Sequence, residues 1–313
     1  MKLHPNEIKQ TGDDRPVDTL LKYVWRMSGY HQLWICLLAL TVAALTMLPL
    51  ELQRRIINGA LESAEMDRLL LLGGLFFGVL LISGLLKFAL RMYQSWLSES
   101  AVRYGRRHLL AINDRKKRNG DDSEESGRAV AIIGTEIDSL GGFVGSGLSQ
   151  PVVNGGMLLA ILGYMLIVEP IVAALGLALL IPQAVLVPMA QSRINRLIER
   201  RLEVVREMSD TISNDADTDE TRVLIDRLYW NRIKTFFIKF MMKGLINLMH
   251  GLAPLGVLIF GGIMVINGQT SVGVVVAFIS GFERMGSPLR ELLTYYRVAA
   301  QASVQHKMIA RWM

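Results

Sequence analysis

Four charged residues stand in a segment that is otherwise apolar enough to cross a membrane. Glu283 and Arg284 lie in an apolar run that begins near residue 272, and Arg290 and Glu291 follow within two helical turns. A charge at the bilayer centre costs about 2.5 to 3.5 kcal/mol on insertion scales, so these residues require a partner, water or a lipid headgroup. Glu283 and Arg290 are seven residues apart and share a helix face, which favours the lining of a polar cavity through the membrane.

A second interpretation of these charges stays open. If Pro288 marks the end of the membrane segment, Arg284, Arg290 and Glu291 extend to the headgroups instead of lining a cavity. The same two interpretations apply to Arg91, which lies with Lys87 near the inner end of another apolar segment.

Asn247 and His250 are the polar pair of a further apolar segment. They are three residues apart and therefore lie on one helix face. Such residues either line a transport pathway or form hydrogen bonds with a neighbouring helix. We keep Glu283, Arg284, Arg290, Arg91, Asn247 and His250 as candidate pathway residues.

No other pattern in the sequence specifies a catalytic or metal site. Residues 215–226 space their acids like a calcium loop, but Glu220 stands where the sharp turn needs glycine. The glycine-rich stretch 141–147 lacks the Lys and Ser/Thr of a phosphate-binding loop, and it is typical of close helix packing. Cys36 is the only cysteine, so an intrachain disulfide is excluded. We expect no enzyme activity, cofactor or metal in this chain.

Six apolar segments must position these residues. Of the 313 residues, 51% are hydrophobic, and a bilayer core of about 30 Å needs about 20 apolar residues per helix. The sequence therefore predicts an all-α membrane protein that spans the bilayer several times. The expected spans are 31–50, 69–91, 150–168, 171–190, 244–266 and 272–293.

The distribution of basic residues predicts the topology. Of the 34 Lys and Arg residues, only Arg54, Arg55 and Arg68 fall in the loops after the first, third and fifth spans. The positive-inside rule therefore places both termini and the long stretches 92–149 and 191–243 in the cytoplasm. No cleavable signal peptide opens the chain, and the bacterial cytoplasmic membrane is the expected location.

The two long stretches predict helical hairpins. Apolar residues recur at three- and four-residue steps, and polar breaks at 118–127 and 209–220 separate a descending from a returning arm. Arms of about 20 to 25 residues reach about 30 to 40 Å beyond the membrane. Residues 1–30 form an N-terminal segment with an interfacial helix over 16–30, so the membrane domain covers 31–313.

This arrangement resembles the transmembrane domain of ABC exporters. The stretch 267–292, "NGQTSVGVVVAFISGFERMGSPLREL", is similar to that family's pattern of glycines, a threonine, an Ala-Phe pair and a later Pro-Leu pair. "SGRAVAIIGTEIDSL", with Gly127 and Glu136, resembles the stretch after the first coupling helix, and Pro49 with "RRIINGAL" resembles the end of the first span. The residues that carry the first pattern are Gly268, Thr270, Gly273, Ala277, Phe278, Pro288 and Leu289.

The resemblance implies the membrane subunit of an exporter that alternates access to a substrate pathway. It implies a homo- or heterodimer and a separate or missing nucleotide-binding ATPase, because no G-x-x-x-x-G-K-[ST] motif occurs in the chain. ATP and Mg²⁺ would bind that ATPase, and no nucleic-acid partner is implied. The residues that the resemblance assigns to coupling are Asn113, Asp114, Arg115, Lys116, Lys117, Arg118, Asp121, Asp122, Asp215, Asp217, Asp219 and Glu220.

The hairpin turns also support alternative functions. The family commonly has aromatic residues in the first turn, whereas both turns are acidic here. A membrane scaffold or regulatory subunit that keeps the exporter fold without ATP coupling is therefore the second hypothesis. A secondary transporter is the third, although long cytoplasmic arms have no role there.

Overall fold

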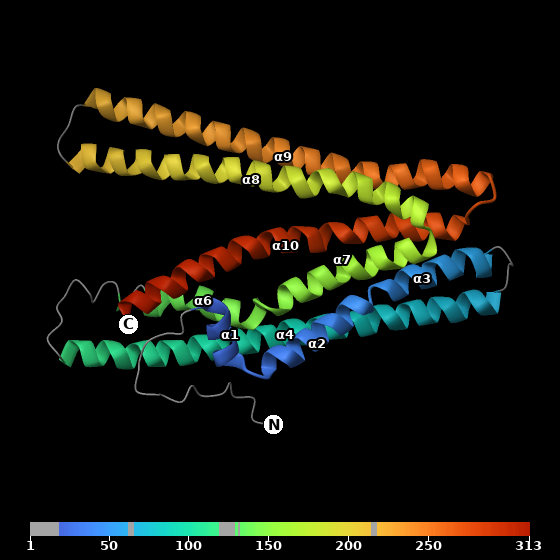
Figure 1. The fold of residues 1–313 in the computed structure, drawn as a ribbon, viewed down its shortest axis with the longest axis horizontal. Coiled ribbons are helices and arrows are strands. Elements are labelled where there is room, and N and C mark those ends of the chain that lie inside the picture. Colours follow the sequence, from blue (N-terminus) through green and yellow to red (C-terminus); the bar gives the residue numbers. More distant parts are fainter. Residues whose placement is uncertain (1–18, 62–65, 119–128, 131, 214–217) are drawn as a thin grey trace. The chain divides into compact units, whose positions relative to one another are not determined.

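The computed structural model describes residues 19–61, 66–118, 129–130, 132–213 and 218–313 (Figure 1). Nearly all of these residues are helical, and none of them lies in a β-strand. Five helices of the described part are long and apolar enough to cross a bilayer. The predicted all-α fold class is confirmed, and it fits an integral membrane protein with several spans.

The described part of the chain consists of α-helices and of two π-helical segments, η1 and η2. In chain order the elements are α1 (Leu20–Ser28), α2 (His31–Ala44), α3 (Met47–Arg55), η1 (Ile56–Leu61), α4 (Met66–Arg118), η2 (Ile132–Glu136), α6 (Ile137–Ser146), α7 (Ser149–Val168), α8 (Pro170–Ser213), α9 (Thr218–Ile266) and α10 (Val272–Trp312).

Five of the six expected spans correspond to helices that are apolar over a membrane-spanning length. The first covers α2, α3 and most of η1, and the others lie in α4, α7, α9 and α10. The expected span 171–190 forms the first half of α8, but many of its side chains lie outside the described residues. The number of six spans therefore stays a prediction.

The loop between α9 and α10 shows why the end of α9 near residue 266 was predictable. Gly268 has a φ of 69°, a conformation that glycine adopts without steric cost. Its N–H donates to the carbonyl of Val265 at 2.9 Å, and the N–H of Gln269 donates to that of Met264 at 2.8 Å. This pair of bonds is a Schellman motif, which satisfies the last carbonyls of α9 and ends the helix.

Helices α4, α8 and α9 extend farthest beyond the thickness of a bilayer core, and α10, with 41 residues, also extends beyond it. Helix α4 has 53 residues, α8 has 44 and α9 has 49. At a rise of about 1.5 Å per residue, α4 is about 80 Å long, against a bilayer core of about 30 Å. Each of the three therefore combines an apolar segment with a polar continuation.

The chain divides into two compact units. Unit 1 contains the described residues up to Tyr164 together with 284–313, and unit 2 contains Met165–Glu283. The dominant contacts of unit 2 are between α8 and α9, which lie side by side as an antiparallel pair in Figure 1. The return from α8 to α9 agrees with a helical hairpin at 191–243.

Glycines on α6 allow that helix to lie very close to α4 within unit 1. A Cβ added at Gly141 would meet Val102, and one added at Gly145 would meet the carbonyl oxygen of Gln94 and the Ser98 backbone. The backbones can approach this closely only because the two glycines, one turn apart, have no side chain. The interpretation of residues 141–147 as a packing element is thereby confirmed.

Polar side chains also join the helices of unit 1. The Gln32 amide donates to the carbonyl of Val144 at 2.6 Å and joins α2 to α6. His31 Nδ1 lies 2.7 Å from the Tyr93 hydroxyl and joins α2 to α4. Hydrogen bonds of this kind hold apolar helices together where lipid removes the hydrophobic driving force between them.

Helix α1 packs on unit 1 and leaves an apolar side exposed. Thr19 caps it by accepting from the Lys22 N–H at 3.4 Å. Val24 and Met27 are buried in the core, whereas Leu21 and Trp25 are exposed. The predicted apolar face thus divides into a packed part and an exposed part, and the exposed part is available to a lipid surface.

Candidate functional site

A group of three cations, here called the cationic cluster, lies between α4 and α10. Lys87 and Arg91 are one turn apart on α4, so they share a helix face. Arg91 and Arg284 of α10 both lie near enough to Lys87 to interact with its charge. The structure thus brings together two of the candidate pathway residues, and it adds Lys87 to them.

Among the described residues, the three cations of this cluster have no acidic partner. Within the described ranges, no carboxylate lies at ion-pair distance from Lys87, Arg91 or Arg284. All three side chains are exposed on the chain, and inside a bilayer their like charges would repel each other until an anion binds. The cluster can therefore hold an anionic group of a substrate or of a lipid.

The remaining candidate pathway residues are Glu283, Arg290, Asn247 and His250. Glu283 and Arg290 are exposed on α10, as is Asn247 on α9, and the His250 side chain lies outside the described residues. Glu291 accepts a hydrogen bond of 3.4 Å from the Gln150 amide, which joins α10 to α7. Among the described candidate side chains, Arg91 and Arg284 are the two that the structure brings together from different helices.

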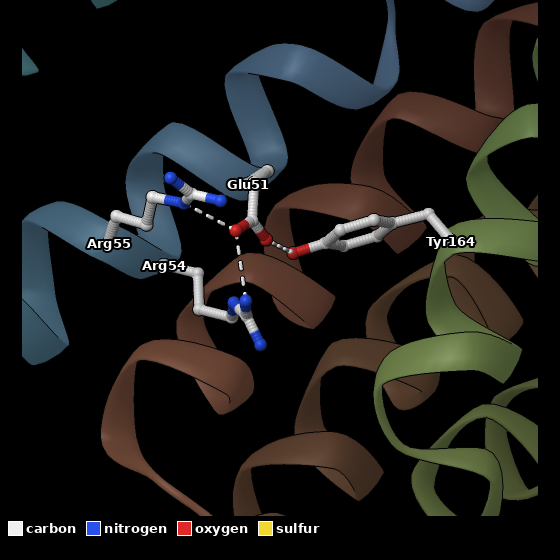
Figure 2. A network of polar contacts seen from close by, with 4 residues as sticks. All are labelled: Glu51, Arg54, Arg55 and Tyr164. Carbon is white, nitrogen blue, oxygen red and sulfur yellow. Dashed lines mark hydrogen bonds and ion pairs between the residues drawn. The ribbon is translucent and has the colours of Figure 1, made fainter.

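A second polar network lies at the far end of the first and third expected spans (Figure 2). Glu51 Oε1 accepts from Arg54 Nη2 at 2.9 Å and from Arg55 Nε at 2.6 Å. Its other oxygen, Oε2, accepts from the Tyr164 hydroxyl at 3.0 Å. One carboxylate thus binds two cations of its own helix and joins α3 to α7.

Sequence analysis did not identify this network. Glu51 stands three and four residues before Arg54 and Arg55, which is a signal for ion pairs along one helix. The contact with Tyr164 has no local signal, because it depends on α3 and α7 being neighbours. We name Glu51, Arg54, Arg55 and Tyr164 the outer network.

The last turns of α4 contain half of the twelve residues that the resemblance assigns to coupling. Asp114, Arg115, Lys117 and Arg118 are exposed there, and Asn113 is half-buried. Arg115 and Arg118 each donate to a backbone carbonyl one turn earlier, at 3.4 and 3.3 Å. Two cationic side chains are therefore held along their own helix, while Asp114 and Lys117 present their charges outward.

Lys116 behaves differently from these neighbours. Its ammonium donates to the Trp312 carbonyl at 2.7 Å and lies 4.8 Å from the centre of the Trp312 indole. Trp312 itself is buried among Leu109, Ile112 and Ile309. Apolar packing and a cation–π contact therefore join the end of α10 to the C-terminal part of α4.

The coupling residues of the second hairpin are described only in part. Asp219 is exposed at the start of α9 and pairs with Arg222 at 3.1 Å. The Glu220 side chain lies outside the described residues, as do Asp215 and Asp217 of the same turn, and Asp121 and Asp122 of the first hairpin also lie outside them.

No protein-family model matches the sequence, and no curated protein matches it.

Proposed function

We propose that this protein is the membrane-spanning subunit of an ABC-type exporter, which forms a dimeric alternating-access pathway driven by a partner ATPase. The single observation that carries this proposal is the continuation of α4, α8 and α9 beyond their apolar segments as unbroken helices. Each continuation covers more than twenty residues, or more than about 30 Å. Rigid helices of this length can transmit a displacement that flexible loops would absorb.

The cationic cluster supports an amphipathic substrate with a negative charge. Lys87, Arg91 and Arg284 lie in or next to the second and sixth expected spans, and no acid of the described chain neutralises them. An apolar substrate would leave these charges uncompensated, whereas an anionic headgroup would bind them. In the proposed topology the cluster lies in the cytoplasmic half of the membrane, where an exporter takes up its substrate.

Purification from native membranes tests the ATPase partner. We expect the full chain to recover a nucleotide-binding polypeptide in near-stoichiometric amount. Lys117→Glu reverses an exposed charge at the proposed coupling end of α4 and should reduce that recovery, whereas Arg193→Glu on α8, also exposed, should not. Recovery of partners that lack a nucleotide-binding domain, with none that has one, would contradict the proposal.

The contact between Lys116 and Trp312 favours a second candidate function, an exporter-like scaffold or regulatory subunit without ATP coupling. Lys116, one of the proposed coupling residues, already contacts Trp312 of the same chain. Spin labels at Leu202→Cys, on the exposed arm of α8, distinguish the two functions when Cys36 is replaced by Ser. In native-membrane complexes, each protomer of the proposed dimer has one label. A change in the distance between the two labels on addition of ATP supports the exporter, and an unchanged distance supports the scaffold.

A further inference from the structure

A groove between α8 and α9 has the size of a small-ligand site. It encloses about 540 Å³ and belongs entirely to unit 2. Ligand pockets in proteins commonly measure about 300 to 1,000 Å³. Leu197, Arg200 and Val204 line it from α8, and the α9 residues that line it are Val223, Asp226, Arg227, Trp230, Asn231 and Lys234.

The charges that line this groove are unbalanced. Arg200, Arg227 and Lys234 stand against the single carboxylate of Asp226. In the described part of the chain, none of these three cations takes part in an ion pair, whereas Arg222, just outside the groove, is paired with Asp219. Three uncompensated cations around one cavity attract an anion and can form charge-assisted hydrogen bonds with it.

The rest of the lining suits an apolar or aromatic group. Leu197, Val204 and Val223 supply aliphatic surface, and the Trp230 side chain is 60% exposed. Tyr229 holds the indole edge-on at a centroid distance of 5.5 Å. A large aromatic side chain that is fixed at one edge and open elsewhere offers binding area at little cost in conformational entropy.

Asn231 adds a hydrogen-bond requirement. Asn231 is one of the lining residues, and its buried Oδ1 has no hydrogen-bond partner among the described residues. A buried acceptor without a partner costs free energy, and an amide oxygen can accept from an N–H or an O–H. A donor group on the ligand would satisfy it.

We propose that this groove binds a small, water-soluble amphipathic anion. Its negative group lies among Arg200, Arg227 and Lys234, and its apolar or aromatic body lies against Trp230. Trp230 precedes the expected span 244–266 by about 14 residues, or about 21 Å, which is too far for the headgroup of a membrane lipid. The groove shares no residue with the cationic cluster, and the proposal does not depend on the transport function.

Charge-matched probes test this site in the full chain, reconstituted in lipid nanodiscs. The probes are naphthalene-2-sulfonate and the neutral naphthalene-2-sulfonamide, which has nearly the same shape. Equilibrium dialysis, with empty nanodiscs as the blank, should show saturable binding of the sulfonate and at least tenfold weaker binding of the sulfonamide. Arg227→Gln with Lys234→Gln should weaken sulfonate binding at least tenfold, and Trp230→Ala should weaken the binding of both probes.

Arg222→Gln is the matched control, because Arg222 belongs to the same helix but does not line the groove. Circular dichroism and gel filtration exclude variants that fail to fold, and Arg200→Gln provides a second lining variant for the same comparison. Equal binding of the two probes would overturn the proposal, as would a loss in Arg222→Gln equal to that in the groove variants. Sulfonate binding that disappears when the chain dimerises would also overturn it, since a second copy would then occupy the groove.

Discussion

The Tyr164 hydroxyl donates a hydrogen bond of 3.0 Å to Glu51 Oε2, which joins the end of α7 to the end of α3. The other carboxylate oxygen is already bound by Arg54 and Arg55 (Figure 2). A tyrosine that donates to an ionised carboxylate forms a charge-assisted bond, which is stronger than a bond between neutral groups. The contact is therefore the interhelical part of the outer network.

Replacing Tyr164 by Phe removes this hydrogen bond and keeps the aromatic ring. We expect the free energy of unfolding to fall by about 1 to 2 kcal/mol, because the carboxylate loses a donor in a partly buried position. Thermal unfolding in nanodiscs measures the change. Tyr296→Phe is the control, since Tyr296 is 77% exposed, and an equal effect of both substitutions would contradict the structural role of Tyr164.

Two glycines on α6, three residues apart, give predictions of opposite sign. Gly145→Ala places a methyl group against Ser98 N and Cβ, both at 2.9 Å, so the helices must separate. We expect a loss of about 1 to 3 kcal/mol in unfolding free energy. At Gly142 the nearest atom, Ser98 Oγ, is 3.9 Å away, so Gly142→Ala should be neutral or stabilise by up to about 1 kcal/mol through helix propensity.

Denaturant or thermal unfolding of both variants checks this difference. The pair is closely matched, because both substitutions add one methyl group to the same short helix. A Gly145→Ala variant as stable as Gly142→Ala would mean that α6 does not lie against α4 as described.

The sequence predicted the features that depend on local patterns. The boundaries near 266 and 272 were correct because Gly268 and the polar residues after it end one helix in a way that sequence alone indicates. The packing role of residues 141–147 was predictable because small residues at one-turn spacing indicate close helix contact. In both cases the determining residues lie within a few positions of the feature.

Contacts between distant helices were not predictable in the same way. Tyr164 lies 113 positions from Glu51, and Lys116 lies 196 positions from Trp312. Each pair depends on which helices are neighbours and on how each is rotated. The same holds for the cationic cluster, where the sequence supplied Lys87 and Arg91 on one face but not the approach of Arg284.

Lys116→Met tests the attachment of α10 to the α4 arm. The substitution removes the hydrogen bond to the Trp312 carbonyl and the cation–π contact, which together contribute about 1 to 2 kcal/mol. We expect faster hydrogen exchange of the amides in the last turns of α10, because this local contact restrains that end. Lys117→Met, at an exposed neighbouring position, should leave the exchange rates unchanged. Equal protection in both variants would show that apolar packing of Trp312 alone fixes the helix end.

Arg284→Gln tests whether the cationic cluster binds an anion. In nanodiscs of zwitterionic lipid, removing one of three like charges should raise the thermal midpoint, because repulsion with Lys87 and Arg91 decreases. Arg297→Gln, at an exposed position further along α10, should leave the midpoint unchanged.

The addition of an amphipathic anion should reverse the order of the thermal midpoints of the original chain and Arg284→Gln. Dodecanoate should stabilise the original chain more than Arg284→Gln, since a ligand that binds the folded state stabilises it in proportion to its affinity. Dodecanol has the same chain without the charge, so it should not distinguish the two proteins. If Arg284→Gln lowered the midpoint in neutral lipid, or if dodecanoate stabilised both proteins equally, the three cations would not form an anion site, and the proposed negative charge on the substrate would have no support.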